Sequence, residues 1–384
     1  MSLVELSFVV REDPWGMRAS TSVIGKLLLN EVHPLWNKDI GEAWCGTHKQ
    51  RPALLKGSTE NLLEYICRDP VATLGKKLLE LNGSELPFLF KILTINSPLS
   101  IQVHPEAKKA IELFNKFPER YQDGTEKAEI GIAITETTLL LGFRPLSEIV
   151  AFLNGLTAAK NFFNKELQSP SIRSLYEKLL TATVNQISSL NTQTFEQLSG
   201  SGSKSVEKEQ FLKLYSMYPD DSGVYQIFFL NLVTLSPAEG VFISPNTIHA
   251  YLSGQLLECM TTSDFVIRAG LTQKEKDVSS LLETIEYEPL KLRKDKPSTS
   301  LEFSAYPIAT DKFRIERLVG SLKREYHLAD SPVLYFCLSG SGSLTESNSS
   351  VQLMPGSVCL ATAGARHFLD LNGEFYRMSV KFDS

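Results

Sequence analysis

Residues 99–106, LSIQVHPE, carry an amide and an imidazole two positions apart, at Gln102 and His104. Because side chains alternate between the two faces of a β-strand, both are predicted to project from the same face. Imidazole nitrogen and amide oxygen can each bind a metal ion. The pair therefore suggests a metal site. The alternative is that His104 is a buried structural histidine, one of six histidines in the chain.

Two further residues complete a candidate ligand set. Glu129 begins a predicted strand in KAEIGIA, and His249 follows a turn that contains Gly240 and Pro245 in the sequence. Two imidazoles, one carboxylate and one amide are donors that zinc accepts in a tetrahedral or five-coordinate open site. Glu106 is an alternative carboxylate, but it begins a predicted helix, so Glu129 is favoured. Spacing alone favours the structural interpretation of these residues.

Metal-binding cupins provide a pattern for comparison. In them two histidines alternate along a strand as H-x-H, a carboxylate follows, and a last histidine comes after a G…P…H turn. Here Gln102-x-His104 takes the place of the histidine pair, and His249 ends the turn. The last third of the chain contains VQLMPGSV and His367 but neither H-x-H nor Q-x-H. It is therefore predicted to be a degenerate, metal-free copy of the same unit.

The segments around these residues are typical of short strands. ELSFVV, EAWCGTH, FLFKILTI, LSIQVH, EIGIAITE and TLLLGF are bounded by Gly, Pro and Asn. After Pro105, the apolar residues of PEAKKAIELFNKF recur at helical intervals and predict a helix. Strand-like segments return in FFLNLVTLSP, GVFISP, QLLECMTT and FVIRAGL, and again between residues 301 and 384.

The stretch between Pro145 and Pro219 has a different, helical pattern. LSEIVAFLNGL, SIRSLYEKLLTATVNQISSL and VEKEQFLKLYSMY are predicted helices, and LSGSGSKS is a predicted flexible loop. The second of these segments is interpreted as one amphipathic helix that packs within the insertion.

The predicted fold class is mainly β with an α insertion, built from two cupin-like jelly-roll β-barrel units plus a helical domain. The first unit, with the metal site, is expected to comprise residues 1–144 and 220–300. Residues 145–219 form the helical insertion, and residues 301–384 form the degenerate C-terminal unit. A chain of 384 residues has room for about two such cores.

Composition excludes several classes of function. A net charge of -5 provides no electrostatic case for nucleic acid or an anionic membrane as a partner. The five cysteines form no C-x-x-C pair, which argues against a disulfide framework and a thiolate metal site. No run of about 18 apolar residues is present. A cytoplasmic protein is expected, and a monomer, although the sequence does not determine the oligomeric state.

The order of these segments closely resembles type I phosphomannose isomerase over nearly the whole chain. Its most specific parts are the Q-x-H-P motif and the block HAYLSGQLLECMTTSDFVIRAGL, and EAWCGTH is similar to the family's N-terminal E-x-W-x-G-T-H segment. The resemblance implies an enzyme that uses one zinc ion per chain and interconverts the phosphosugars mannose 6-phosphate and fructose 6-phosphate. The C-terminal unit is the weakest part of the match.

The resemblance also implies roles for single residues. It assigns Gln102, His104, Glu129 and His249 as zinc ligands and Arg268 of VIRAG as a catalytic residue. Lys127 matches the family's lysine before the ligand glutamate. Two segments depart from the family: H-K-P-E is EKAE at residues 126–129, which removes any role of the histidine, and Y-D-W-G is replaced by EDPWG at residues 12–16, where Trp15 is the secure match.

The chemistry of isomerisation suggests a role for each of these groups. A proton moves between C1 and C2 through an enediolate, whose charge needs a cation nearby. An arginine stays protonated because its pKa exceeds about 12, so Arg268 is assigned an electrostatic role. Lys127 is a candidate base, and Asp264 and Tyr251 are competing proton carriers.

Substrate-binding residues are less specified by the sequence. Lys91 and Ser100 are expected to hold the phosphate as a point charge and a hydroxyl donor. The alternative for Lys91 is the solvent side of an amphipathic strand. Trp15 and Trp44 are candidates for lining the sugar pocket, although tryptophan is more often a core residue. Two rival functions remain open: a metallo-cupin of another reaction, such as an iron oxygenase, and a non-catalytic phosphosugar-binding cupin.

Overall fold

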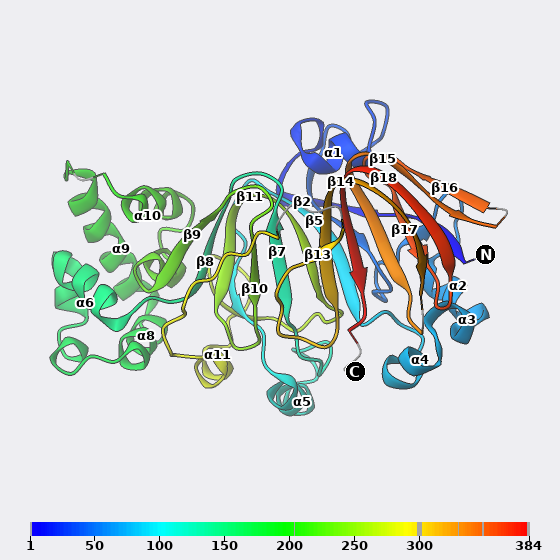
Figure 1. Ribbon diagram of the computed structural model, residues 1–384. Helices are drawn as coiled ribbons and strands as arrows, with labels where there is room; N and C mark the ends of the chain where they lie inside the picture. The colour runs from blue at the N-terminus through cyan, green and yellow to red at the C-terminus, as the bar shows by residue number, and fades with distance from the viewer. Residues whose placement is uncertain (1, 203, 298–301, 329, 348, 382–384) are drawn as a thin grey trace.

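The computed structural model describes residues 2–202, 204–297, 302–328, 330–347 and 349–381. Two β-sheets lie side by side, and a group of helices lies beyond the larger sheet (Figure 1). The first and the last strand of the chain both belong to the smaller sheet. Among the described residues, no helix has the length and apolar character that crossing a membrane would require.

The larger sheet has ten strands and carries the candidate metal ligands. Its strands are β2 (Val9–Arg18), β3 (Asp39–Cys45), β5 (Phe88–Ile95), β6 (Ile101–Val103), β7 (Glu129–Ala133), β8 (Thr137–Phe143), β9 (Leu230–Leu235), β10 (Gly240–Ile243), β11 (His249–Thr261) and β12 (Ile267–Gly270). All the pairings are antiparallel.

The long strand β11 connects two parts of this sheet. Its first residues pair with β6 and β8, whereas the residues from Gly254 onward pair with β5 and β7. The register shifts between Tyr251 and Ser253, and Gly254 has a φ of 118°. A Cβ at Gly254 would lie 2.4 Å from Oγ1 of Thr137, so only glycine fits this bend. The bend lets one strand contribute to two faces.

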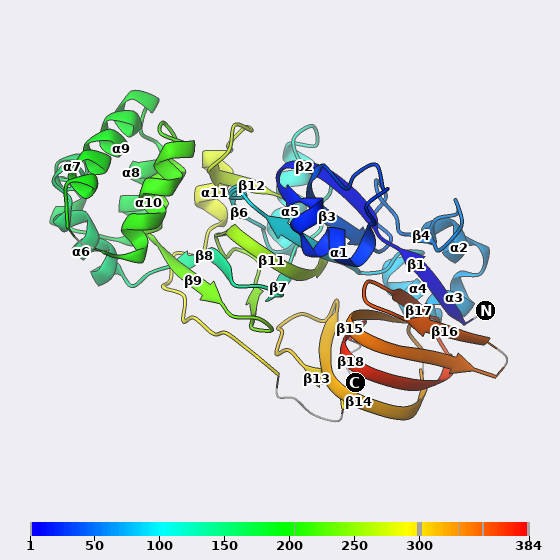
Figure 2. The same ribbon diagram turned by 90° about the horizontal axis from the view of Figure 1, so that it is seen from above.

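The smaller sheet has eight strands. They are β1 (Leu3–Ser7), β4 (Leu54–Leu55), β13 (Ser304–Ala305), β14 (Arg314–His327), β15 (Val333–Glu346), β16 (Ser349–Leu353), β17 (Val358–Ala361) and β18 (Arg366–Ser379). The first strand of the chain pairs with β17, so the N-terminal segment lies in the C-terminal sheet (Figure 2).

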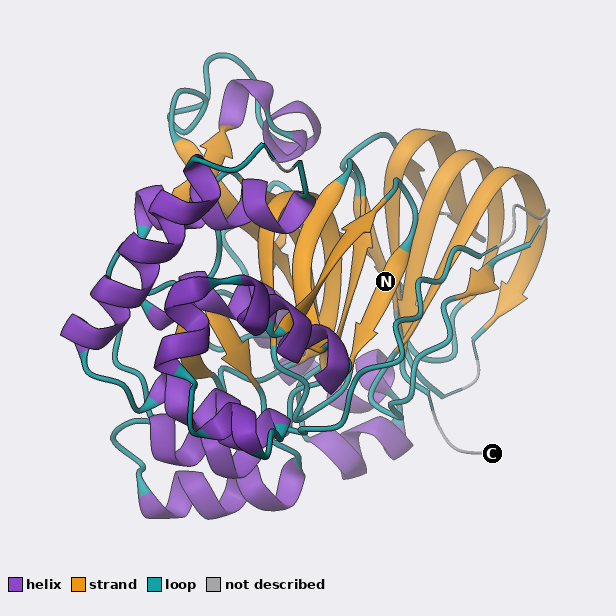
Figure 3. Cartoon of the chain, turned by 90° about the vertical axis from the view of Figure 1, so that its left-hand side faces the viewer, coloured by secondary structure: helices purple, strands orange, loops and turns teal. Residues whose placement is uncertain are grey.

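Residues 146–217 form the helices α6 (Leu146–Gly155), α7 (Thr157–Phe162), α8 (Ile172–Leu180), α9 (Val184–Ser199) and α10 (Val206–Met217), with a 3-10 helix η2 (Glu166–Gln168). They gather at the left-hand end of the molecule in Figure 1, which faces the viewer in Figure 3. The single helix predicted from SIRSLYEKLLTATVNQISSL is wrong, because the segment forms two helices. The side chain of Thr183 accepts a hydrogen bond from the backbone of Gln186 and starts α9 there.

The other helices are short connections around the sheets. They are α1 (Val23–Leu28), α2 (Leu62–Arg68), α3 (Pro70–Leu74), α4 (Lys76–Asn82), α5 (Ala107–Lys116), α11 (Val278–Thr284) and the 3-10 helices η1 (Ala19–Thr21) and η3 (Ser222–Phe228). The helix predicted after Pro105 is confirmed as α5. The region of α2 to α4 was not predicted to be helical, although Asn61 caps α2 and Asp69 caps α3.

Two apolar clusters hold these layers together. One joins the helices to the larger sheet and includes Ile101, Val103 and Ile267. The other fills the space between the two sheets, where the rings of Phe90 on β5 and Phe336 on β15 have centroids 5.2 Å apart. Each fully buried side chain of this size contributes roughly 2 kcal/mol to stability.

The predicted class, mainly β with a helical insertion, is confirmed. The prediction of closed barrels is wrong, because neither sheet closes on itself through pairing among the described strands. Other segments cover the sheet edges instead. At β10, the backbone of Gly240 exchanges hydrogen bonds with Asp295, and at β12 the neighbour on one side is η3. Covering an edge removes the need for a further strand there.

Candidate metal centre

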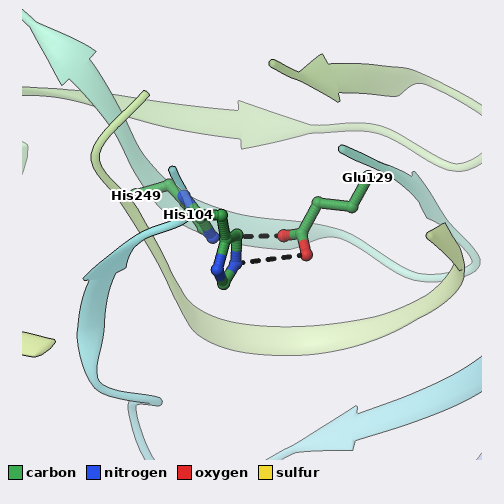
Figure 4. A group of neighbouring side chains, drawn as sticks. All are labelled: His104, Glu129 and His249. Carbon is green, nitrogen blue, oxygen red and sulfur yellow. Dashed lines mark ion pairs between the residues drawn. The ribbon is translucent and has the colours of Figure 1, made fainter. Parts of the chain in front are cut away.

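Three side chains from distant parts of the chain converge at one point (Figure 4). His104 follows β6, Glu129 begins β7 and His249 begins β11. Oε1 of Glu129 lies 3.1 Å from Nε2 of His249, and Oε2 lies 3.6 Å from Nε2 of His104. One candidate ligand atom from each residue lies within 4.8 Å of the others. All three residues are at most 2% exposed.

Hydrogen bonds fix the direction in which each imidazole can bind. Nδ1 of His104 donates to the carbonyl oxygen of Phe265 at 2.7 Å, and Nδ1 of His249 donates to that of Thr247 at 2.9 Å. Each Nε2 therefore carries a lone pair toward Glu129. Among the described residues, Nε2 of His104 and both carboxylate oxygens of Glu129 make no hydrogen bond. Acceptors that face one another in a buried site call for a cation.

The protonation states favour metal binding as well. Burial, followed by the nearby charge of Lys127, lowers the pKa of His104 to about 3, so its imidazole is neutral at physiological pH. Burial alone would raise the pKa of Glu129, but the nearby charge of Lys127 holds it well below its ordinary value. One carboxylate and two imidazoles whose Nε2 atoms face it are a donor set that zinc accepts. The residues therefore fit a zinc ion.

Gln102 lies at the same point. It is directly opposite His249 in the register of β6 with β11 and opposite Arg268 in the register of β6 with β12. The side-chain nitrogen Nε2 of Gln102 lies 3.4 Å from Nε2 of His249. Because a half-turn of the amide exchanges its nitrogen and oxygen, Gln102 can present either atom to this cluster.

Two cations border the cluster. Nζ of Lys127 lies 3.1 Å from Oε2 of Glu129, and the residue is 6% exposed. Arg268 is the cross-strand neighbour of Gln102, and directly opposed side chains lie on the same face of a sheet. Burial lowers the pKa of Arg268, although an arginine remains a cation at neutral pH. None of the ion pairs among the described residues involves Arg268, so its charge is available to a ligand.

A row of opposed residues crosses the part of the larger sheet formed by β3, β5, β11 and β7. Trp44, Lys91, Glu258 and Gly131 occupy directly opposed positions on β3, β5, β11 and β7. Nζ of Lys91 lies 3.3 Å from Oε2 of Glu258 and 4.7 Å from the ring centroid of Trp44. Lys91 is 7% exposed, so the alternative of a solvent-facing lysine is wrong. Burial alone would lower the pKa of Lys91, but Glu258 and other carboxylates raise it.

Other predicted residues lie around this row. Tyr251 is buried, and its hydroxyl makes no hydrogen bond among the described residues. The hydroxyl also lies close to Gly131: a Cβ at Gly131 would be 2.5 Å from the hydroxyl oxygen. Oδ2 of Asp264 lies 3.0 Å from Nε2 of His48, and this hydrogen bond lowers the pKa of Asp264. Ser100 is half-buried in the segment that precedes β6.

The remaining residues considered in the sequence are described by their own contacts. Trp15 packs against Gly41, where a Cβ would lie 2.5 Å from the indole ring. Glu106, the alternative carboxylate, is exposed and precedes α5. In the C-terminal sheet, Nε2 of His367 is hydrogen-bonded to the hydroxyl of Tyr335 at 3.0 Å.

Sequence reasoning missed two members of the site region. Glu258 was not singled out, although an acid within the apolar run LLECM is a signal, because buried carboxylates need a partner. His48 was quoted only as part of EAWCGTH, and its contact with Asp264 joins residues that are 216 positions apart. No local pattern reveals a contact of that kind.

Fold and site together define a mainly β protein with a zinc-type metal centre between the parts of one sheet. Residues 3–146 match the family model described as the catalytic domain of type I phosphomannose isomerase. The chain belongs to this family. A probable mannose-6-phosphate isomerase of Echinococcus multilocularis is 37% identical over 307 residues, which cover 72% of this chain and 71% of that protein. The human mannose-6-phosphate isomerase is 35% identical over 310 residues, covering 74% and 73%.

Solved structures agree with these relatives. The crystal structure of mannose 6-phosphate isomerase in its zinc-bound form superposes with a TM-score of 0.90 at 28% identity and full coverage of both chains. The same values hold for the Salmonella typhimurium enzyme bound to fructose 6-phosphate and zinc.

Proposed function

We propose that this protein is a zinc-dependent mannose-6-phosphate isomerase, which interconverts mannose 6-phosphate and fructose 6-phosphate. The observation that carries the proposal is the convergence of His104, Glu129 and His249 with both Nε2 lone pairs directed at the carboxylate. Membership of the family and the zinc and fructose 6-phosphate bound by the Salmonella enzyme support the choice of metal and substrate.

Gln102, His104, Glu129 and His249 are proposed to hold the zinc ion. One carboxylate and three neutral ligands leave a net positive charge of about one, and a bound zinc ion acts as a Lewis acid toward sugar oxygens. A set of thiolates would remove that charge. The hydrogen bonds from the two Nδ1 atoms to backbone carbonyls orient the imidazoles and raise their basicity.

The reacting proton and the developing charge are assigned to groups of the chain. Arg268 is proposed to stabilise the enediolate, because its guanidinium is on the face of Gln102 and forms no ion pair with the described residues. Lys127 is proposed as the proton carrier, since its Nζ is the amine within 3.1 Å of Glu129. Asp264, held ionised by His48, is the competing carrier. Tyr251 is the less suitable base, because burial keeps its pKa well above the ordinary value and its hydroxyl therefore stays protonated.

Substrate contacts are proposed for Lys91, Ser100, Trp15, Tyr251 and Asp264. The support for Lys91 is its position on the same face of the sheet as Glu258 and Trp44, next to the metal centre. Its charge suits a phosphate dianion. Ser100 adjoins β6, which carries Gln102.

Isomerisation of mannose 6-phosphate by the zinc-loaded protein, followed with and without a chelator, tests the function. The proposal expects turnover that is lost on chelation and restored by zinc. Turnover that survives complete removal of zinc contradicts it. Redox turnover with iron would favour the first rival function, and phosphosugar binding without turnover would favour the second.

A cytoplasmic monomer with three domains, at the boundaries expected from the sequence, is also proposed. All five cysteines are free thiols, which suits a reducing compartment. The exposed large apolar side chains, such as Val32, Leu81, Ile111 and Val184, come from separate elements. Scattered apolar residues do not require a partner surface.

A further inference from the structure

Strand β12, which carries Arg268, has an irregular ladder next to that residue. Among the described strands it pairs with β6 alone, and the register shifts between Arg268 and Gly270. Ala269 therefore lies in a bulge, where the backbone needs partners other than a neighbouring strand. Ile267 and Ala269 pack into the apolar cluster of the helices, on the face opposite Arg268. The position of Arg268 thus depends on the groups that bind the backbone of this bulge on the side of the helices.

The 3-10 helix η3 supplies those partners with buried side chains. Nε2 of Gln226 donates to the carbonyl oxygen of Ala269 at 3.2 Å, and Oε1 of Gln226 accepts from the hydroxyl of Tyr176 at 2.6 Å. Both residues are fully buried. The carbonyl oxygen of Ala269 can only accept, so Gln226 must present its nitrogen there, and the hydroxyl of Tyr176 donates to the amide oxygen and holds the amide in this orientation.

Asp221 holds the end of the same strand. Oδ1 of Asp221 accepts from the backbone nitrogens of Gly223 at 2.6 Å and Leu271 at 3.0 Å, and Leu271 has a φ of 52°. Gly223 and Gly270 are in close contact: a Cβ at Gly270 would lie 2.6 Å from the Cα of Gly223. Helix η3 and β12 therefore meet backbone to backbone, with little freedom to slide.

We propose that Gln226, oriented by Tyr176, is a positioning residue of the isomerase: it fixes the bulge at Ala269 and thereby sets the guanidinium of Arg268 beside the metal centre. This inference rests on the proposed function, because the role given to Arg268 is to stabilise the enediolate of the isomerisation. Through Gln226, the helical insertion contributes to catalysis without contacting substrate. A displacement of a catalytic group by about 1 Å can cost as much as 100-fold in rate.

The chain offers a matched pair of variants for the test. Tyr176→Phe removes the buried hydroxyl that orients Gln226. Tyr225→Phe removes another buried hydroxyl, that of Tyr225 on η3. This hydroxyl lies 3.3 Å from Oγ1 of Thr194, so its hydrogen bond is made to α9 and not to β12. Gln226→Met keeps the side-chain length and removes both of its hydrogen bonds. Isomerisation kinetics, zinc content and melting temperature are measured for each zinc-loaded full-length variant.

Gln226→Met and Tyr176→Phe are expected to lower kcat by about tenfold or more with little change in KM or zinc content. Tyr225→Phe is expected to keep the wild-type kcat even where its melting temperature falls as far as that of Tyr176→Phe. In an Arg268→Ala background, Gln226→Met is expected to cause little further loss of kcat, because Gln226 acts on the reaction through Arg268.

Three results would overturn the inference. They are a wild-type kcat in Tyr176→Phe and Gln226→Met, an equal loss of kcat in Tyr225→Phe, and a full additional loss in the Arg268→Ala background. Should Gln226→Met fail to fold, Tyr176→Phe decides the matter alone. A wild-type protein that does not isomerise mannose 6-phosphate would overturn the proposed function together with this inference, whereas an active wild type with unaffected variants overturns only the inference.

Discussion

Glu258 lies directly opposite Lys91 in the register of β11 and β5, and its Oε2 is 3.3 Å from Nζ of the lysine. Both residues are buried, at 4% and 7% exposed. Breaking a buried ion pair by removing one partner is costly, because the other charge stays in the interior without compensation. The pair therefore links the stability of the sheet to the electrostatics of the metal centre next to it.

Lys91→Met tests this link through stability. The variant leaves the Glu258 carboxylate buried without its cation, so the free energy of unfolding is expected to fall by about 3–5 kcal/mol. Urea denaturation of the zinc-loaded protein measures the change. The matched control is Lys323→Met, which breaks an exposed pair with Asp370 of 2.8 Å and is expected to cost about 0–1 kcal/mol.

The double variant Lys91→Met, Glu258→Leu separates the pair from the packing of its members. Removal of both charges is expected to destabilise the protein less than Lys91→Met alone, since no uncompensated charge remains. Additive losses in the two single variants would mean that the two side chains do not compensate each other.

His104→Ala is expected to release zinc and abolish isomerisation, because it removes one of the two imidazoles of the cluster. Metal analysis after gel filtration, together with the isomerase assay, measures both effects. His327→Ala, which changes an exposed histidine on β14, is the control and should keep zinc and activity. Full zinc occupancy in His104→Ala would remove this residue from the ligand set.

Arg268→Lys is expected to fold and bind zinc normally but to lose about 100-fold in kcat. A lysine keeps the charge but not the planar set of donors that an arginine directs at an oxyanion. Steady-state kinetics and zinc content are compared with those of Arg366→Lys, at an exposed position on β18. An unchanged kcat in Arg268→Lys would take Arg268 off the list of catalytic residues.

The sequence predicted much of the fold because its signals are local. The helix after Pro105 and the strands around Gln102 follow from periodicity. The pairing of β1 with β17 does not, since it joins residues at opposite ends of the chain. Barrel closure was expected from the cupin pattern, but whether a sheet edge finds another strand or a segment such as η3 depends on tertiary packing.

The candidate site shows the same limit. Gln102 and His104 stand out by their spacing, and the choice of Glu129 over Glu106 relied on predicted elements. Glu258 was missed because its role depends on the register of β11 with β5. Gln226 carries no motif at all, since its significance comes from one hydrogen bond to Ala269. Residues that act through long-range contacts become visible only once the strands are in register.

The C-terminal sheet provides a pH-dependent prediction away from the metal centre. Burial, followed by the charge of Arg377, lowers the pKa of His367 to about 4, against about 6.5 for an ordinary histidine. Tyr326 and Tyr335 are the other titratable groups whose rings face it. Between these two pKa values the unfolded chain binds a proton that the folded protein does not, so stability falls as the pH falls from about 6.5 toward 4.

His367→Gln is expected to remove part of this acid sensitivity, because a glutamine has no proton to bind in the unfolded state. From these pKa values, the histidine costs roughly 2 kcal/mol of stability at pH 5 relative to pH 7. Urea denaturation at the two pH values should therefore give a smaller difference for His367→Gln than for the wild type, while His327→Gln, at an exposed site, should match the wild type. An equal difference in all three proteins would mean that His367 titrates alike in the folded and unfolded states, and that its burial beside Arg377 does not exclude the proton.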